Sequence, residues 1–291
     1  MTPTPTSPES PGSRLRAALQ SSDILPFIGT YDVFSAALAG RHFDALFISG
    51  FGFAASHYGL PDIGFITWSE MVYYVQRIRT VLPRHHILVD IDDGYCDPEV
   101  AGHVVSILEA SGASGVVLED QKRPRRCGHF EGKQIMDLDE YLAKLKLVLA
   151  TRRDLYVVAR TDSSDPADIE RRILAFAEAG ADAVLVDGLT SLDIVRNLSG
   201  KIKIPFCFNQ IAGGKSPACT LSELHDVGVR VAIYSTPCLF AAQPAIEDAM
   251  VALKQADGSL ADSRIGVKEC TQVLQENLAR RSAPTLSVTT P

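Results

Sequence analysis

The segment from Glu119 to Lys133 concentrates side chains that can do chemistry. Two carboxylates open it, and five cationic side chains, a cysteine, a histidine and two glycines follow within fifteen residues. Neighbouring cations favour the thiolate form of a cysteine, so Cys127 could exchange a proton with a substrate or attack a carbonyl group. The alternative is an incidental cysteine on a basic loop, because the chain has six cysteines. The glycines would let the loop move as a lid over a binding site.

Two aspartates at the end of another apolar run indicate a cation site. Asp90 and Asp92 would project from the same side of a strand, and like charges that close raise each other's pKa unless a cation neutralises them. Glu119, at the end of the next apolar run, could join them. A carboxylate cluster with no neighbouring histidine or cysteine suits Mg²⁺ or Mn²⁺. The alternative is a polar turn with solvated aspartates.

Arg160 ends an apolar run and needs an anion as its partner. That anion is either Asp187, which ends the next run, or a carboxylate of the substrate, and the spacing does not separate the two. The segment from Ser49 to Gly52 offers backbone N–H groups that a ligand oxygen could approach closely. A tight turn after a strand explains the same segment equally well.

Eight short apolar runs predict the strands that position these residues. Most are continuously hydrophobic, as expected of parallel strands buried on both faces. The predicted strands are Leu25–Gly29, Ala45–Ser49, Ile87–Asp92, Gly115–Glu119, Tyr156–Arg160, Ala183–Asp187, Pro205–Asn209 and Val231–Tyr234. A site at the carboxyl ends of such strands would collect the polar residues described above.

Helical patterns separate the strands. Asp97 and Asp165, each followed by a proline, predict helix starts, and Asp137 with Glu140 predicts a capping box. Eight alternating strand and helix units favour an α/β fold of the (β/α)8 TIM-barrel type, with an open doubly wound sheet as the alternative. Leu239–Gln255 is expected to close the barrel. Val267–Arg281 has one apolar face, which could pack on another subunit or on its own chain.

Composition indicates the domain boundaries, the classes of partner and the cellular compartment. We expect a disordered tail at residues 1–12, the barrel at 13–256, a helical extension at 257–281 and a second tail at 282–291. The net charge of −7 gives no indication of a nucleic-acid or anionic-membrane partner. No apolar run approaches the ~18–20 residues of a membrane span. The cysteines are scattered without metal-binding spacing, which is typical of free thiols in a reducing, cytoplasmic compartment.

Taken together, these motifs resemble those of the isocitrate lyase and phosphoenolpyruvate mutase superfamily. The run Glu119-Asp-Gln, followed by Arg-Cys-Gly-His129, is similar to the signature loop of its lyase branch. Further similar segments occur in the same order, and the resemblance covers roughly Leu15 to Ala242. They are Ser49-Gly-Phe51, Gly59–Phe65, Asp90–Tyr95, Ala159–Asp162, and Asn209 with Gly213–Pro217.

The resemblance implies an Mg²⁺-dependent enzyme, with Mn²⁺ as a possible replacement. Asp90 and Asp92 would bind the ion, and Asp62 and Glu119 would support it through water. The resemblance further implies substrate contacts from Ser49, Gly50, Phe51, Gly128, Arg160 and Asn209, and a catalytic group of Cys127, Arg125, His129 and Asp187. It also implies a homotetramer in which the C-terminal helix is exchanged between subunits.

The reaction implied is cleavage of a carbon–carbon bond in a small anionic carboxylate, a 2-hydroxy dicarboxylate of the substituted-malate type. An α-keto acid would form through a metal-bound enolate, with Cys127 as general acid. A phosphonomutase, an oxaloacetate-hydrolase-like enzyme and a ligand-binding barrel with altered chemistry are the alternatives.

Four positions depart from the superfamily's pattern and bear on the substrate. Arg125 stands where lyases have lysine, Asp187 where many members have glutamate, and Ala212 at a position that is often glutamate. Phe240 falls where methylisocitrate-type lyases have a carboxylate-binding arginine. That last departure argues against a tricarboxylate substrate and favours a smaller or more apolar one.

Overall fold

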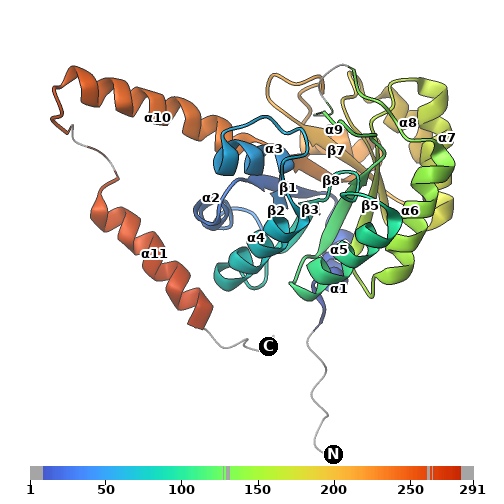
Figure 1. The fold of residues 1–291 in the computed structure, drawn as a ribbon, viewed down its shortest axis with the longest axis horizontal. Helices are drawn as coiled ribbons and strands as arrows, with labels where there is room; N and C mark the ends of the chain where they lie inside the picture. Colours follow the sequence, from blue (N-terminus) through green and yellow to red (C-terminus); the bar gives the residue numbers. More distant parts are fainter. Residues whose placement is uncertain (1–8, 127, 129–131, 261–262, 264, 283–291) are drawn as a thin grey trace, which may run out of the picture.

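Eight parallel strands form a closed barrel in sequence order, from β1 to β8 (Figure 1). The computed structural model describes residues 9–126, 128, 132–260, 263 and 265–282. The strands are β1 Leu25–Thr30, β2 Ala45–Ile48, β3 His86–Asp90, β4 Gly115–Glu119, β5 Tyr156–Thr161, β6 Ala183–Val186, β7 Phe206–Gln210 and β8 Val229–Tyr234. All eight predicted strands are confirmed, with bounds within two residues of those expected. The (β/α)8 barrel is therefore confirmed, and an open sheet is excluded.

Helices surround this barrel. They are α1 Pro11–Ser21, α2 Val33–Ala39, α3 Gly50–Phe53, α4 Trp68–Val81, α5 Pro98–Ala110, α6 Leu138–Thr151, α7 Pro166–Ala179, α8 Asp193–Ser199, α9 Leu221–Asp226, α10 Pro237–Gln255 and α11 Val267–Ser282. A π-helical turn, η1 Ala54–Tyr58, follows α3. The predicted caps at Asp97 and Asp165 are confirmed, because each side chain accepts backbone N–H bonds of the first turn. The capping box at Asp137 is wrong, since its side chain makes no such bond.

The start of the chain also corrects a prediction. Composition predicts a disordered tail through residue 12, but α1 begins at Pro11 and Ser10 caps it by accepting the Ser13 N–H. The N-terminal end of α1 packs against the loop before β5, because the Ser10 and Ser13 hydroxyls and Arg16 bind Asp154. The rest of that predicted tail, and residues 283–291 of the second, lie outside the described residues.

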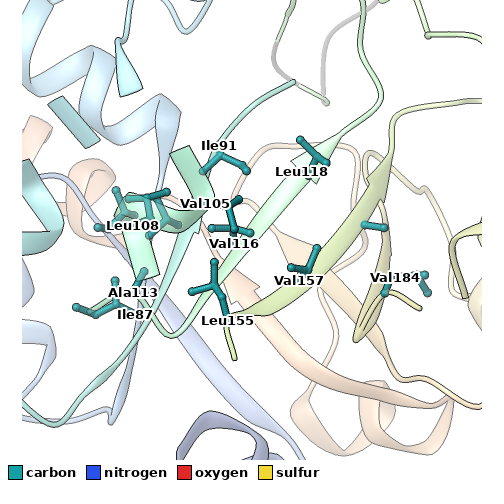
Figure 2. Packing of buried hydrophobic residues seen from close by; sticks show 14 of the residues in the cluster. Ile87, Ile91, Val105, Leu108, Ala113, Val116, Leu118, Leu155, Val157 and Val184 are labelled. Carbon is teal, nitrogen blue, oxygen red and sulfur yellow. The ribbon is translucent and has the colours of Figure 1, made fainter. Parts of the chain in front are cut away.

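Two hydrophobic layers hold the barrel together. The outward side chains of the strands meet the helices, as Figure 2 shows for Ile87 and Val116 beside Val105 and Leu108 of α5. The inward side chains fill the barrel interior in a second cluster that includes Phe47, Leu88, Val117, Val158, Leu185 and Cys207. Alternate residues of each strand therefore face the two layers.

The helix after β8 does not close the barrel, and that prediction is wrong. None of the residues of α10 is buried, and Figure 1 shows α10 running away from the barrel. Helix α11 then turns back and contacts α4, where Val273 is buried and Glu276 forms an ion pair with Arg41. Large apolar side chains on both helices remain exposed, among them Ile246, Met250, Leu274 and Leu278.

Within the part of the chain that the structure describes, five cysteines are free thiols: Cys96, Cys207, Cys219, Cys238 and Cys270. Cys207 is buried in the barrel interior. No helix among the described residues is long and apolar enough to span a membrane.

We expect Leu108→Ala to lower the free energy of unfolding by about 2–5 kcal/mol, because Leu108 is fully buried between α5 and the barrel. Chemical denaturation with matched slopes measures the change. The control is Leu174→Ala on α7, where the side chain is 38% exposed and the loss should stay below about 1 kcal/mol. Equal losses in the two variants would contradict this packing of α5 on the barrel.

Candidate active site

The alternation that fills the barrel interior also builds the site. On β2 and β3, Ser49 and Asp90 follow the inward-facing Phe47 and Leu88 by two residues. The same spacing relates further polar residues to inward-facing ones at the ends of the other strands: Glu119, Arg160, Asp187, Asn209 and Ser235. All seven polar side chains are buried. Period-two geometry thus places them together at the carboxyl end of the barrel, where enzymes of this fold bind substrates.

Arg125 lies inside the predicted metal site. Its Nη1 and Nη2 are each 2.8 Å from a carboxylate oxygen, of Asp62 and Asp92 respectively, and its Nε donates to Glu119 Oε1 at 2.8 Å. The residue is only 2% exposed. The structure therefore brings Asp62, Asp92 and Glu119 together as predicted, around a guanidinium group.

Asp90 and Asp92 are held by the turn that ends β3. Asp92 adopts a left-handed backbone conformation with φ 52°, its N–H donates to Asp90 Oδ1, and its carbonyl accepts the Glu119 N–H. Aspartate tolerates this conformation better than most residues, although it carries some strain. The turn fixes the backbone of Asp92 relative to Asp90, which lines the cavity, and to Glu119.

Arg160 binds protein carboxylates. Its Nε is 2.8 Å from Asp162 Oδ2, and its Nη2 is 2.8 Å from Asp187 Oδ2 and 3.2 Å from Glu119 Oε2. The structural partner that the sequence left open is therefore Asp187, together with Asp162. Asp162 was not predicted as a site residue, although it follows Arg160 by two residues on the same face of β5.

Asn209 and Ser235, at the ends of β7 and β8, also line the cavity. The Asn209 amide donates to Asp187 Oδ1 at 3.1 Å, and the Ser235 hydroxyl donates to Asn209 Oδ1 at 2.7 Å. Ser235 was not predicted, although its place two residues after Ile233, which faces the barrel interior, could have indicated it. Ser49 accepts the Gly52 N–H, and Phe51 packs edge-to-face on Phe240 of α10 with ring centroids 6.3 Å apart.

Acidic side chains outnumber basic side chains in this buried region. Among the described residues here, the carboxylates of Asp62, Asp90, Asp92, Glu119, Asp162 and Asp187 face Arg125, Arg160 and Lys133. Burial raises the pKa of Asp92 well above its ordinary value and that of Glu119 to about 7, against the opposing effect of Arg125. Burial alone would lower the pKa of Arg125, but Asp92, Glu119 and Asp62 raise it well above its ordinary value. The guanidinium therefore stays charged.

The donor chemistry fits a divalent cation, but in this structure Arg125 engages the carboxylates of Asp62, Asp92 and Glu119. Oxygens of Asp62, Asp90 and Asp92 each lie 3.4 Å from the point beside Gly50 where a Cβ atom would stand, so these three carboxylates converge there. Within the described part of the chain, no group of three or more histidine, cysteine, aspartate or glutamate residues is arranged to hold an ion as it stands. The carboxylates would have to leave Arg125 and draw together.

The described parts of the loop after β4, residues 120–126, 128 and 132–136, include Arg125 and Gly128, which line the cavity of the site. A bridge between Gln121 and Ile135 forms the base of the loop, and the Gln121 side chain bonds both backbone groups of Arg126. Gly128 is buried on the arginine–carboxylate network, and Lys133 Nζ donates to its carbonyl at 2.5 Å. The predicted catalytic residues Cys127 and His129 lie outside the described residues. The cavity left beneath the loop measures only about 30 Å³.

The comparisons with known proteins agree with this fold and site. The model of the family described as phosphoenolpyruvate phosphomutase matches residues 15–254. A 2-methylisocitrate lyase from Aeropyrum pernix is 34% identical over 230 residues, which cover 78% of this chain and 74% of that protein. A crystal structure of 2,3-dimethylmalate lyase, a member of the PEP mutase/isocitrate lyase superfamily, has a TM-score of 0.87 at 29% identity, covering 94% and 95% of the two chains. Oxaloacetate acetylhydrolase bound to 3,3-difluorooxalacetate also has a TM-score of 0.87, at 30% identity and 94% and 96% coverage.

The fold, the buried charged centre and these similarities define a (β/α)8-barrel enzyme of the carbon–carbon lyase type. The chain belongs to the phosphoenolpyruvate phosphomutase family, within the PEP mutase/isocitrate lyase superfamily.

We expect Gly128→Ala to expel the loop from its place over the site. The added Cβ would stand 2.6 Å from Asp162 Oδ1 and 2.7 Å from Arg160 Nη2, and closer still to Asp187 Oδ2. Trypsin cleavage after Arg125 and Arg126 should accelerate at least about tenfold, because proteolysis follows the population of the open loop. Gly200→Ala is the control, since nothing lies within 4 Å of its added Cβ. An unchanged cleavage rate in Gly128→Ala would show that the loop does not depend on this contact.

Proposed function

We propose that this protein is an Mg²⁺-dependent lyase that cleaves a substituted-malate type 2-hydroxy dicarboxylate into an α-keto acid and a second carboxylate. The observation that carries the proposal is the buried centre at the carboxyl end of the barrel. There, Arg160 and a set of carboxylates lie beneath the loop that bears Cys127. Six buried carboxylates in one region, three of which line the cavity, favour a site that takes up further positive charge.

The residues of the chain divide the reaction between them. Arg160, which is buried and charged, would bind a carboxylate of the substrate and stabilise the negative charge that develops on it. Asp187, which lines the cavity, would accept the proton of the 2-hydroxyl group. The C2–C3 bond then breaks and a carbonyl forms at C2. The electron pair of the broken bond passes to C3, which is next to the second carboxylate of the substrate. The Cys127 thiol would donate a proton to C3, and the loop would exclude water from this step.

Mg²⁺ would be held by Asp90 and Asp92, with Asp62 and Glu119 supporting it, and Mn²⁺ would fit the same oxygen donors. When bound, the ion supplies Lewis-acid polarisation of the substrate oxygens. Asn209, Ser49, Gly50, Phe51 and Gly128 would orient the substrate, and His129 would act beside Cys127.

The wall formed by Phe51 and Phe240 supports a small or apolar-substituted substrate. These rings pack on each other at the point where α10 leaves the barrel, and they offer no positive charge to a third carboxylate. Release of α-keto acid from alkyl-substituted malates is therefore expected to exceed release from a tricarboxylate.

We further propose a cytoplasmic homotetramer. The free thiols among the described cysteines support a reducing compartment. The exposed apolar residues of α10 and α11 support an exchange of these helices between subunits, because isolated helices seldom leave such surfaces uncovered.

A hydrolytic cleavage of oxaloacetate is the second candidate. The structural similarity to oxaloacetate acetylhydrolase equals that to 2,3-dimethylmalate lyase, with a TM-score of 0.87 for both. Phosphonomutase chemistry, or ligand binding without turnover, would give a different pattern of products, so one assay distinguishes all four functions.

That assay measures α-keto acid release from a panel of substituted malates and, in parallel, oxalate formation from oxaloacetate and conversion of a phosphonate. We expect turnover of at least one malate with Mg²⁺ and its loss in excess chelator. Cys127→Ser should lower kcat by about 10²–10⁴-fold, the usual contribution of a general acid. Cys96→Ser, which changes an exposed free thiol, is the matched control. If no malate is cleaved under any of these conditions, the lyase proposal fails; full activity of Cys127→Ser would remove the cysteine from the mechanism.

A further inference from the structure

We propose that Arg125 is a tethered cation that competes with the divalent ion for the same carboxylates and thereby sets the metal affinity of the site. Metal would then enter only as Arg125 leaves. This inference rests on the Mg²⁺ dependence proposed above.

The guanidinium group of Arg125 is fully committed to carboxylates. Each of its three nitrogens contacts a different partner at 2.8 Å, and the side chain is only 1% exposed. Asp62 and Asp92 each bind Arg125, and each also has an oxygen among those that converge on the point beside Gly50. For Asp92 it is the same atom, Oδ1, that serves both. One oxygen cannot hold a strong bond to the guanidinium and coordinate a metal ion closely at the same time.

Charge makes the two cations exclusive. The cavity of about 30 Å³ holds roughly a water molecule, so it has room for a bare ion but not for the several waters that Mg²⁺ usually keeps. A divalent ion next to a buried guanidinium would also be repelled strongly, because the low local dielectric screens little. Binding of metal therefore requires the side chain of Arg125 to move out.

The movement of Arg125 is coupled to its loop. Arg123, two residues before it, forms a two-point ion pair with Asp93, and Gly128, three residues after it, packs on Arg160 and Asp187. Arg125 thus lies between two anchors of the same segment. Metal that displaces Arg125 would loosen the loop, and a loosened loop would favour metal by the same factor, since linkage is reciprocal.

Arginine at this position makes the competition strong. Its planar fork donates to three carboxylates at once, whereas a lysine ammonium is a compact charge that cannot match all three directions. Arg126, the next residue on the loop, is exposed, whereas Arg125 is buried among the carboxylates. Arg126 therefore provides a control with the same charge on the same loop.

The test compares Mn²⁺ binding to the wild-type protein, Arg125→Gln, Arg125→Lys and Arg126→Gln by titration calorimetry, without substrate. We expect Arg125→Gln to bind Mn²⁺ at least about tenfold more tightly than wild type, Arg125→Lys to lie between them, and Arg126→Gln to equal wild type. If Arg125→Gln does not fold, Arg125→Lys carries the comparison. Equal affinities for wild type and both Arg125 variants would overturn the inference and leave Mg²⁺ dependence standing. Absence of Mn²⁺ binding to every protein would overturn both.

A second measurement uses the wild-type protein alone. Mn²⁺ should accelerate tryptic cleavage after Arg125, because the displaced side chain becomes accessible, although most ligands protect the loop that covers them. Slower cleavage with Mn²⁺ would overturn the inference even if an Arg125 variant bound metal more tightly.

Discussion

Burial of negative charge at the mouth of the barrel is the constraint on which the site depends. A buried carboxylate without a partner is costly, and here six of them share one enclosed region. Arg160 lies near the carboxyl end of β5, while Arg125 and Lys133 belong to the loop after β4. The loop is therefore part of the charge balance of the barrel as well as its cover, and its position responds to any other cation that enters.

The barrel separates stability from chemistry along each strand. The middle of a strand contributes apolar side chains inward and outward, which pack in two layers. At the carboxyl ends of β2 to β8 a charged or polar residue follows on the inward face, whereas β1 has Gly29 at this position. Because neighbouring strands are fixed in register, these residues reach each other with little freedom to adjust. Helix-covered packing thus holds the charged groups at close distances that a flexible scaffold would not maintain.

Arg125 occupies the carboxylates that the sequence predicts as metal ligands. A lysine at this position would leave some carboxylate oxygens free, whereas the guanidinium engages three carboxylates together. The chain itself thus supplies a cation to this carboxylate cluster. Phe240 packs on Phe51, which lines the cavity, so an aromatic contact joins the start of α10 to the site.

Local pattern determined the barrel and most of the site. Continuous apolar runs placed all eight strands, and the ends of these runs placed Asp90, Arg160 and Asp187 at the carboxyl end of the barrel, because parallel strands all end on the same side. Tertiary structure decided what the local pattern does not contain. The contact of Arg125 with Asp62 spans 63 residues, so only the folded loop reveals which of several loop cations enters the cluster. The path of α10 away from the barrel was likewise beyond the sequence, since an apolar helix face does not specify which surface will cover it. The sequence thus determined which groups lie at the carboxyl end of the barrel, and the tertiary structure decided which cation neutralises them.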